Sequence, residues 1–159
     1  MLIEHPRLRD YIFRALDTGP VLVQRGLSKV NEDQWDHRYD HERFTLREVV
    51  SHLADWETIF QNRFKLILSE DSPPLPTLDP GQLAIDGQYS QRDPFEQIRL
   101  FKNRRSETIA LLEGVPNDQW VRSGIFDGNF HISIEGWATS IPRHDLYHLR
   151  QISDWTDVS

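Results

Sequence analysis

Two histidines near the end of the chain, His144 and His148, are four residues apart. In a helix, side chains at this spacing lie one turn apart on the same face and can share a ligand. Both occupy positions in an apolar stripe that runs from Ile141 to Ile152. His52 interrupts an earlier apolar stripe in the same way. We therefore expect three imidazoles to point from two helices toward one interior.

Three inward histidines predict a site for a divalent metal ion. A single inward histidine is usually a core residue hydrogen-bonded to a carbonyl or a carboxylate. Three together need a partner for every ring nitrogen, and one divalent ion binds three neutral imidazoles at once. Three histidine ligands leave a coordination position open, which is typical of a catalytic site. A metal ion there would lower the pKa of a bound water to about 7 and would deprotonate a bound thiol. Imidazole ligands suit Zn, Ni and Fe, and the sequence does not choose among them.

Three further residues could support such a site. Gln151 follows His148 by three residues and is our candidate catalytic residue, able to hydrogen-bond a ligand of the metal, although a surface glutamine is the plain alternative. Asp55 and Asp145 are candidates to accept hydrogen bonds from the outer ring nitrogens of the histidines.

The other histidines are expected to be ordinary. His37 and His41 also have a spacing of four, but their segment has no apolar stripe and is predicted to be a solvated loop. His5 and His131 stand near the terminus and in a loop. The chain contains neither a phosphate-binding glycine loop nor an H-E-x-x-H motif, because Asp145 stands where that motif has glutamate.

Four helices are predicted to position these residues. The second begins near Leu46, because Thr45 and Glu48 form a capping box, and it runs to about Ser69. The third begins at the pair Asp93 and Pro94 and ends near Gly114. The remaining expectations are a first helix over residues 6–30 that Gly19 and Pro20 break or bend, and a fourth that Ser133 caps and Pro142 kinks.

Between these helices the chain is harder to interpret. Residues 70–92 contain four prolines and two glycines without a sustained period, which predicts one long crossover loop. Residues 121–132 are the only segment that could form strands. The blocks 30–35 and 115–120 share Val, Asp, Gln and Trp in register, which indicates either a duplicated helical hairpin or two similar loops. The predicted fold is an all-α four-helix bundle of two hairpins joined by a long crossover, a single domain over residues 1–159.

The composition of the chain excludes several kinds of site and partner. The chain has 159 residues, a formal net charge of −7 and no cysteine, which excludes disulfides and cysteine zinc sites. An acidic balance argues against nucleic acid as a partner. The longest apolar run is four residues, so we expect no membrane span, and the first residues show no signal peptide. We expect a cytoplasmic protein with a small-molecule substrate.

Two segments give the chain a family resemblance. The run from Phe44 to Glu57, which includes His52, and the later H-D-L-Y-H-L-R-Q-I from His144 to Ile152 resemble the DinB/YfiT-like superfamily. The resemblance covers nearly the whole chain. It implies a four-helix bundle with a nickel or zinc ion on His52, His144 and His148, and often a homodimer. Relatives with known activity include bacillithiol or mycothiol S-transferases and a thiol-dependent maleylpyruvate isomerase.

Two functions remain open on the sequence. The first is an enzyme whose metal ion activates a low-molecular-weight thiol for attack on a small electrophile, with a hydrolase that uses metal-bound hydroxide as its variant. The second is a noncatalytic bundle that binds a metal or a ligand. An open fourth coordination position that faces a pocket would favour the enzyme.

Overall fold

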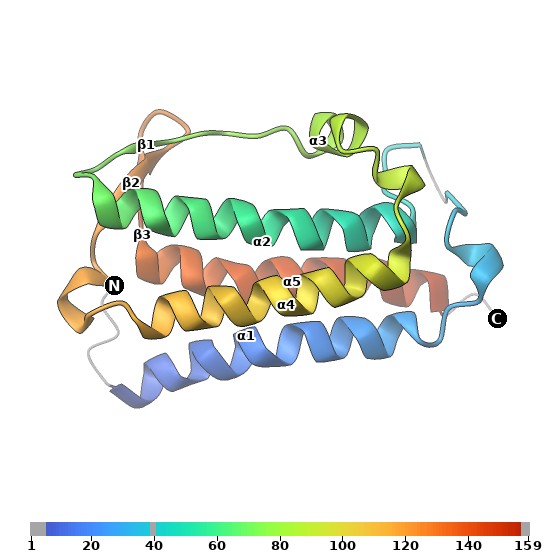
Figure 1. Ribbon diagram of the computed structural model, residues 1–159, viewed down its shortest axis with the longest axis horizontal. Coiled ribbons are helices and arrows are strands. Elements are labelled where there is room, and N and C mark those ends of the chain that lie inside the picture. Colours follow the sequence, from blue (N-terminus) through green and yellow to red (C-terminus); the bar gives the residue numbers. More distant parts are fainter. Residues whose placement is uncertain (1–5, 39–40, 157–159) are drawn as a thin grey trace.

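The computed structural model describes residues 6–38 and 41–156, and helices dominate it (Figure 1). The long helices are α1 (Pro6–Leu27), α2 (Leu46–Ser69), α4 (Pro94–Glu113) and α5 (Ile134–Thr156), and α3 (Pro80–Asp86) is short. The strands are β1 (Pro74–Leu75), β2 (Ser123–Phe126) and β3 (Phe130–Ser133). Single 3₁₀ turns occur at Glu32–Gln34, Tyr89–Gln91 and Asn117–Gln119. None of the described helices is both long and apolar enough to span a membrane.

The predicted ends of α2 are confirmed. The Thr45 hydroxyl accepts from the Glu48 backbone N–H at 3.2 Å, and the Glu48 carboxylate accepts from the Thr45 backbone N–H at 2.8 Å. These reciprocal bonds satisfy two N–H groups that have no partner inside the helix. Ser133 caps the start of α5 as predicted, because its hydroxyl accepts a hydrogen bond from the Gly136 N–H at 3.1 Å.

Pro20 and Pro142 both lie inside continuous helices, which rules out a break of the first helix at Gly19 and Pro20. α1 continues through Pro20 and ends at Leu27, three residues earlier than predicted, and α5 continues through Pro142. The glycine before Pro20 has a packing role. A Cβ at Gly19 would lie 2.1 Å from an Asp145 carboxylate oxygen, so only glycine permits this approach of α1 to α5.

The four long helices form the predicted bundle, but they do not pair as two consecutive hairpins. The closest pairs are α2 with α4 and α1 with α5, while α1 also lies beside α4 and α2 beside α5. Each close pair thus takes one helix from either side of the crossover. The seam between α2 and α5 and the seam between α1 and α4 lie on opposite sides of the bundle.

The crossover is more ordered than the expected loop. It contains β1, α3 and one 3₁₀ turn, and β1 pairs in parallel with β2 through Pro74 and Ile125. β2 and β3 form an antiparallel hairpin, which confirms residues 121–132 as the strand-forming segment. Gly124 lets the crossover approach, since a Cβ there would lie 2.7 Å from the Leu75 side chain.

A buried arginine joins this sheet to the bundle. The Arg63 guanidinium lies 4.2 Å from the centre of the Trp137 ring and 5.2 Å from that of Phe126, and it donates to the Pro76 carbonyl at 3.3 Å. Burial lowers the pKa of Arg63 to about 10. Stacking on aromatic faces thus stabilises a cation that has left most of its water.

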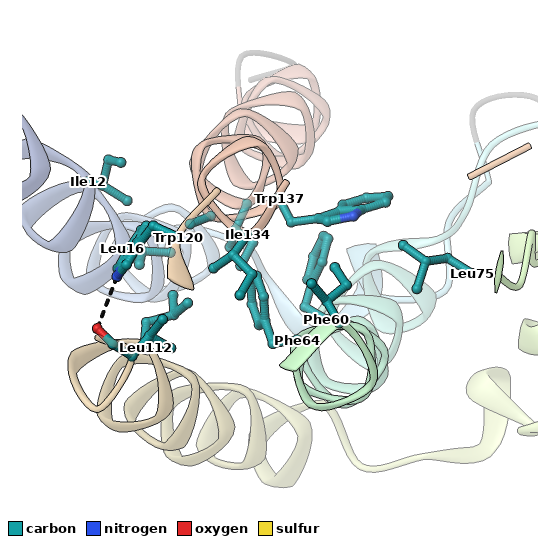
Figure 2. Packing of buried hydrophobic residues seen from close by; sticks show 13 residues of the cluster. Ile12, Leu16, Phe60, Phe64, Leu75, Leu112, Trp120, Ile134 and Trp137 are labelled. Carbon is teal, nitrogen blue, oxygen red and sulfur yellow. Dashed lines mark hydrogen bonds between the residues drawn. The ribbon is translucent and has the colours of Figure 1, made fainter. Parts of the chain in front are cut away.

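Two apolar clusters form the core, one near each end of the bundle. Figure 2 shows the first, in which Trp120 and Trp137 pack with Phe60, Phe64 and the other labelled residues. Trp35 belongs to the second cluster. Trp35 and Trp120 are the tryptophans of the two similar blocks. Each directly follows a 3₁₀ turn and is at least 95% buried, so the blocks share both local structure and packing role.

Candidate metal centre

α2 and α5 bring His52, His144 and His148 together where the two helices face each other. The Nε2 atom of His144 lies 2.9 Å from that of His52 and 3.2 Å from that of His148. The three candidate ligand atoms all lie within 4.8 Å of one another. One turn of α5 therefore supplies two of the imidazoles and α2 supplies the third at the same height.

The cluster lies in an aromatic and largely dry setting. His52 and His148 are 3% and 4% exposed. The Trp56 ring lies 4.6 Å from His52 and stacks at 5.8 Å with His144, and Phe44 lies 5.4 Å from His52. These contacts fix the positions of the imidazoles without supplying a charge.

Burial keeps all three imidazoles neutral. Desolvation, and then repulsion from His148, lowers the pKa of His52 to about 3. Desolvation lowers the pKa of His148 to about 4, against a smaller opposing effect of its hydrogen bond to Gln151. Desolvation also lowers the pKa of His144 well below its ordinary value, with the other two histidines and Arg105 adding to the effect. Each ring thus has a nitrogen lone pair to offer at neutral pH.

Gln151 contacts His148 itself. Its Oε1 atom lies 2.7 Å from His148 Nδ1, so the ring donates its Nδ1–H to the amide oxygen and its Nε2 lone pair faces the cluster. The amide nitrogen of Gln151 donates to the Tyr147 hydroxyl at 3.4 Å. Gln151 therefore orients a candidate ligand, a role that differs from the predicted bond to a ligand of the metal.

The predicted roles of Asp55 and Asp145 are wrong. Both oxygens of Asp55 accept from Arg92 and Arg104 at 2.9 Å, and both oxygens of Asp145 accept from Arg105 at 2.7–2.9 Å. Among the described residues, neither carboxylate accepts a hydrogen bond from a histidine ring. Their partners lie 37 to 49 residues away in sequence, so nothing local could have identified them.

A buried ion network below the histidines was not foreseen. Arg105 on α4 donates to Glu57 on α2 at 2.6 Å, to Asp145 on α5 at 2.7 Å and to the Leu16 carbonyl on α1 at 2.8 Å. Both ion pairs have side chains that are 2% exposed. Burial opposes the charge of Arg105, but the hydrogen bonds and charges of the two carboxylates raise its pKa above the ordinary value. The sequence signal was three charged residues at inward helical positions.

A cleft of about 320 Å³ opens over the histidines. Its described lining comprises the three histidines with Glu42, Arg43, Phe44, Trp56, Pro80, Tyr147 and Gln151. Pro80 opens α3, so the crossover forms one wall. Phe44 and Tyr147 were not predicted as site residues. Trp56 follows His52 by four residues and Tyr147 follows His144 by three, so helical spacing places each beside a candidate ligand.

The remaining described histidines are not part of this cluster. His37, His41 and His131 are exposed. His5 lies outside the described residues.

The neutral rings fit a divalent ion, and so do the separations of 2.9 and 3.2 Å from the Nε2 atom of His144 to those of His52 and His148. Three nitrogens bound tetrahedrally at about 2.0–2.1 Å from zinc lie about 3.3 Å apart. Two neutral Nε2 atoms 2.9 Å apart also need a cation or a shared proton between their lone pairs.

Comparisons with known proteins agree with this architecture. The chain is 25% identical over 148 residues to YfiT of Bacillus subtilis, named "Putative metal-dependent hydrolase", which covers 92% of this chain and 83% of that one. A protein of the same name from Oceanobacillus iheyensis is 24% identical over 140 residues, or 87% and 80% of the two chains.

The solved structure of YfiT has the same fold. It superposes with a TM-score of 0.88 at 23% identity and covers 96% of this chain and 88% of that one. It is described as "a probable metal-dependent hydrolase with an unusual four-helix bundle topology". Residues 15–152 also match the family description of the DinB superfamily, and the chain belongs to that superfamily.

Proposed function

We propose that this protein is a metal-dependent enzyme in which His52, His144 and His148 hold one divalent ion. Nickel and zinc are the preferred candidates, followed by iron. The ion would activate a low-molecular-weight thiol that attacks a small electrophile. One observation carries the proposal. Three neutral imidazoles converge at the floor of a cleft that opens to solvent. A coordination position left by three histidines would face that cleft, whereas a structural site would be closed by protein atoms.

The ion would supply a nucleophile at neutral pH, because coordination lowers the pKa of a bound thiol or water. The chain supplies the rest. Gln151 holds the His148 ring in the tautomer that offers Nε2. Phe44 and Trp56 exclude water and offer apolar walls to a small substrate.

The lining favours a thiol over water as the nucleophile. Glu42 is the only carboxylate among the described lining residues, and its side chain is 84% exposed. A metal-bound water with a pKa near 7 is only partly deprotonated at neutral pH, and hydrolysis usually also needs a positioned general base or acid, whereas a coordinated thiol is deprotonated outright. In the transfer step the sulfur forms the new bond with its lone pair. The leaving group departs with the electrons of the broken bond, and the thiol proton passes to water.

A hydrolase is the second candidate, because the relatives are named as metal-dependent hydrolases. It would use the same three histidines and the same cleft, with water in place of the thiol. The noncatalytic reading is less favoured, since the cleft reaches all three imidazoles.

The experiment compares the two nucleophiles on metal-loaded protein. Monochlorobimane with bacillithiol, mycothiol or cysteine reports thiol transfer, and p-nitrophenyl acetate without thiol reports hydrolysis. We expect acceleration of the first reaction that falls by more than about 100-fold in His148→Ala. The control His131→Ala removes an exposed imidazole and should keep full activity. Acceleration of the ester alone would establish the hydrolase, and loaded protein inactive in both assays would refute the proposed enzyme.

A further inference from the structure

A second hollow lies on the opposite side of the bundle from the histidines. We call it the α1–α4 hollow. It has a volume of about 380 Å³, and its lining residues are Gln24, Leu27, Ser28, Trp35, Phe95, Ile98, Arg99, Lys102 and Asn103. These come from α1, from α4 and from the turn between α1 and α2, and none of them lines the histidine cleft.

The floor of the α1–α4 hollow is apolar and closely packed. Leu27, Trp35 and Ile98 are each at least 91% buried and belong to the second core cluster. Phe95 forms one wall with its edge toward Trp35, at 5.8 Å between ring centroids, yet it is 63% exposed. An aromatic side chain left this open beside an apolar floor has surface that a ligand would cover.

The rim of the hollow is basic. Arg99 and Lys102 are the only ionisable residues among the described lining residues. Lys102 donates to the Gln24 side chain at 2.9 Å, and Arg99 has Glu96 at 3.8 Å outside the hollow. The chain as a whole has a net charge of −7, whereas the described rim of the hollow carries two positive charges and no negative one. The rim would therefore attract an anion.

We propose that the α1–α4 hollow binds a small amphipathic anion, a carboxylate carried on an apolar body. The floor and Phe95 would cover the body, and Arg99 and Lys102 would meet the carboxylate at the rim. A purely polar ligand would gain nothing from the apolar floor, and an uncharged ligand would gain nothing from the two cations. The site needs no metal and is independent of the proposed function.

The test is calorimetric titration of the metal-free full chain with sodium octanoate and, in parallel, with 1-octanol. We expect one octanoate per chain with a Kd of about 1 mM or tighter, and weaker binding of octanol. The double variant Arg99→Gln with Lys102→Gln should weaken octanoate by about tenfold, as the loss of two partly exposed charge pairs implies. Its affinity for octanol should not change.

Two controls locate the binding. Arg14→Gln with Lys65→Gln makes the same change in net charge at exposed positions elsewhere and should leave the octanoate Kd unchanged. Gln24→Trp places a large side chain in the hollow and should abolish binding of both ligands. The proposal fails if octanoate does not saturate, if the Arg14 and Lys65 control weakens it equally, or if Gln24→Trp leaves the affinity intact.

Discussion

The burial of three imidazoles against one another ties the stability of this protein to proton concentration. In the unfolded chain each imidazole titrates near pH 6.5, whereas burial lowers the pKa to about 3 in His52 and about 4 in His148. Below pH 6.5 these imidazoles therefore bind protons in the unfolded chain but remain unprotonated in the folded chain. Stability from these groups is complete above pH 6.5 and is lost as the pH falls toward 4.

We predict that metal-free protein loses stability on acidification. Between pH 6.5 and 5, His52 and His148 should each cost about 2 kcal/mol of unfolding free energy. Urea denaturation at a series of pH values measures this loss. His148→Gln should reduce the slope by about 1.4 kcal/mol per pH unit, and His131→Gln should not change it. An unchanged slope in His148→Gln would show that this imidazole is already charged in the folded state.

Gln151 offers a test of ligand orientation. Gln151→Ala removes the acceptor of the His148 Nδ1–H and frees the ring to turn, so zinc affinity should fall by about 10- to 100-fold. Competition with a chromophoric chelator measures the affinity. Gln24→Ala, on α1 and away from the cluster, is the matched control. Equal affinity in both variants would mean that packing against Tyr147 and the other two imidazoles is enough to fix the His148 ring.

Arg105 is the point where the four long helices meet. Its guanidinium contacts side chains from α2 and α5 and a carbonyl from α1, while its own backbone lies in α4. A charge pair this deep gains little over an apolar core of the same shape, but removal of one partner leaves uncompensated charge. We therefore expect the pairs of Arg105 with Glu57 and Asp145 to matter mainly for which helices meet, and in which register.

We predict that Arg105→Met destabilises the protein by about 3–5 kcal/mol, because the carboxylates of Glu57 and Asp145 remain buried without a cation to compensate their charge. Arg99→Met, on the same helix and 73% exposed, should change stability by less than about 0.5 kcal/mol. Chemical denaturation at pH 7 compares them. Equal unfolding free energies in the two variants would show that the buried carboxylates take up protons at little cost.

At the scale of elements, local signals could be predicted and remote ones could not. The Thr45 and Glu48 capping box and the spacing of His144 and His148 act within one or two turns, and both were predicted from the sequence. β1 is only two residues long and depends on a partner 51 residues away, so it has no period of its own. The partners of Asp55 and Asp145 could not be predicted for the same reason, because they are arginines that are remote in the sequence.

For the whole molecule, metal binding and folding should be linked. The three histidines come from both halves of the chain, so an ion bound to them stabilises only the folded state. Zinc at about 100 times its Kd should add about 2.7 kcal/mol and raise Tm by about 5–10 °C. Calorimetric melting with and without chelator measures the shift. His148→Ala should show none, and an equal shift in that variant would place the ion elsewhere.

The bundle as a whole was predictable, but its pairing was not. Apolar stripes identify four helices and their buried faces, whereas several arrangements bury the same stripes equally well. The contacts of α1 with α5 and of α2 with α4 depend on particular residues. One of them is Gly19 on α1, whose missing Cβ leaves room for the Asp145 side chain of α5.

The interleaved pairing makes the two halves of the chain mutually dependent. A proteolytic cut between β1 and α3, near residue 78, would yield one fragment with α1 and α2 and another with α4 and α5. Each fragment would carry helices whose closest partners belong to the other. Neither could bury its apolar stripes alone, and each would hold only part of the histidine cluster. The protein is thus suited to fragment complementation, in which recovery of zinc binding reports that two separately expressed pieces have reassembled.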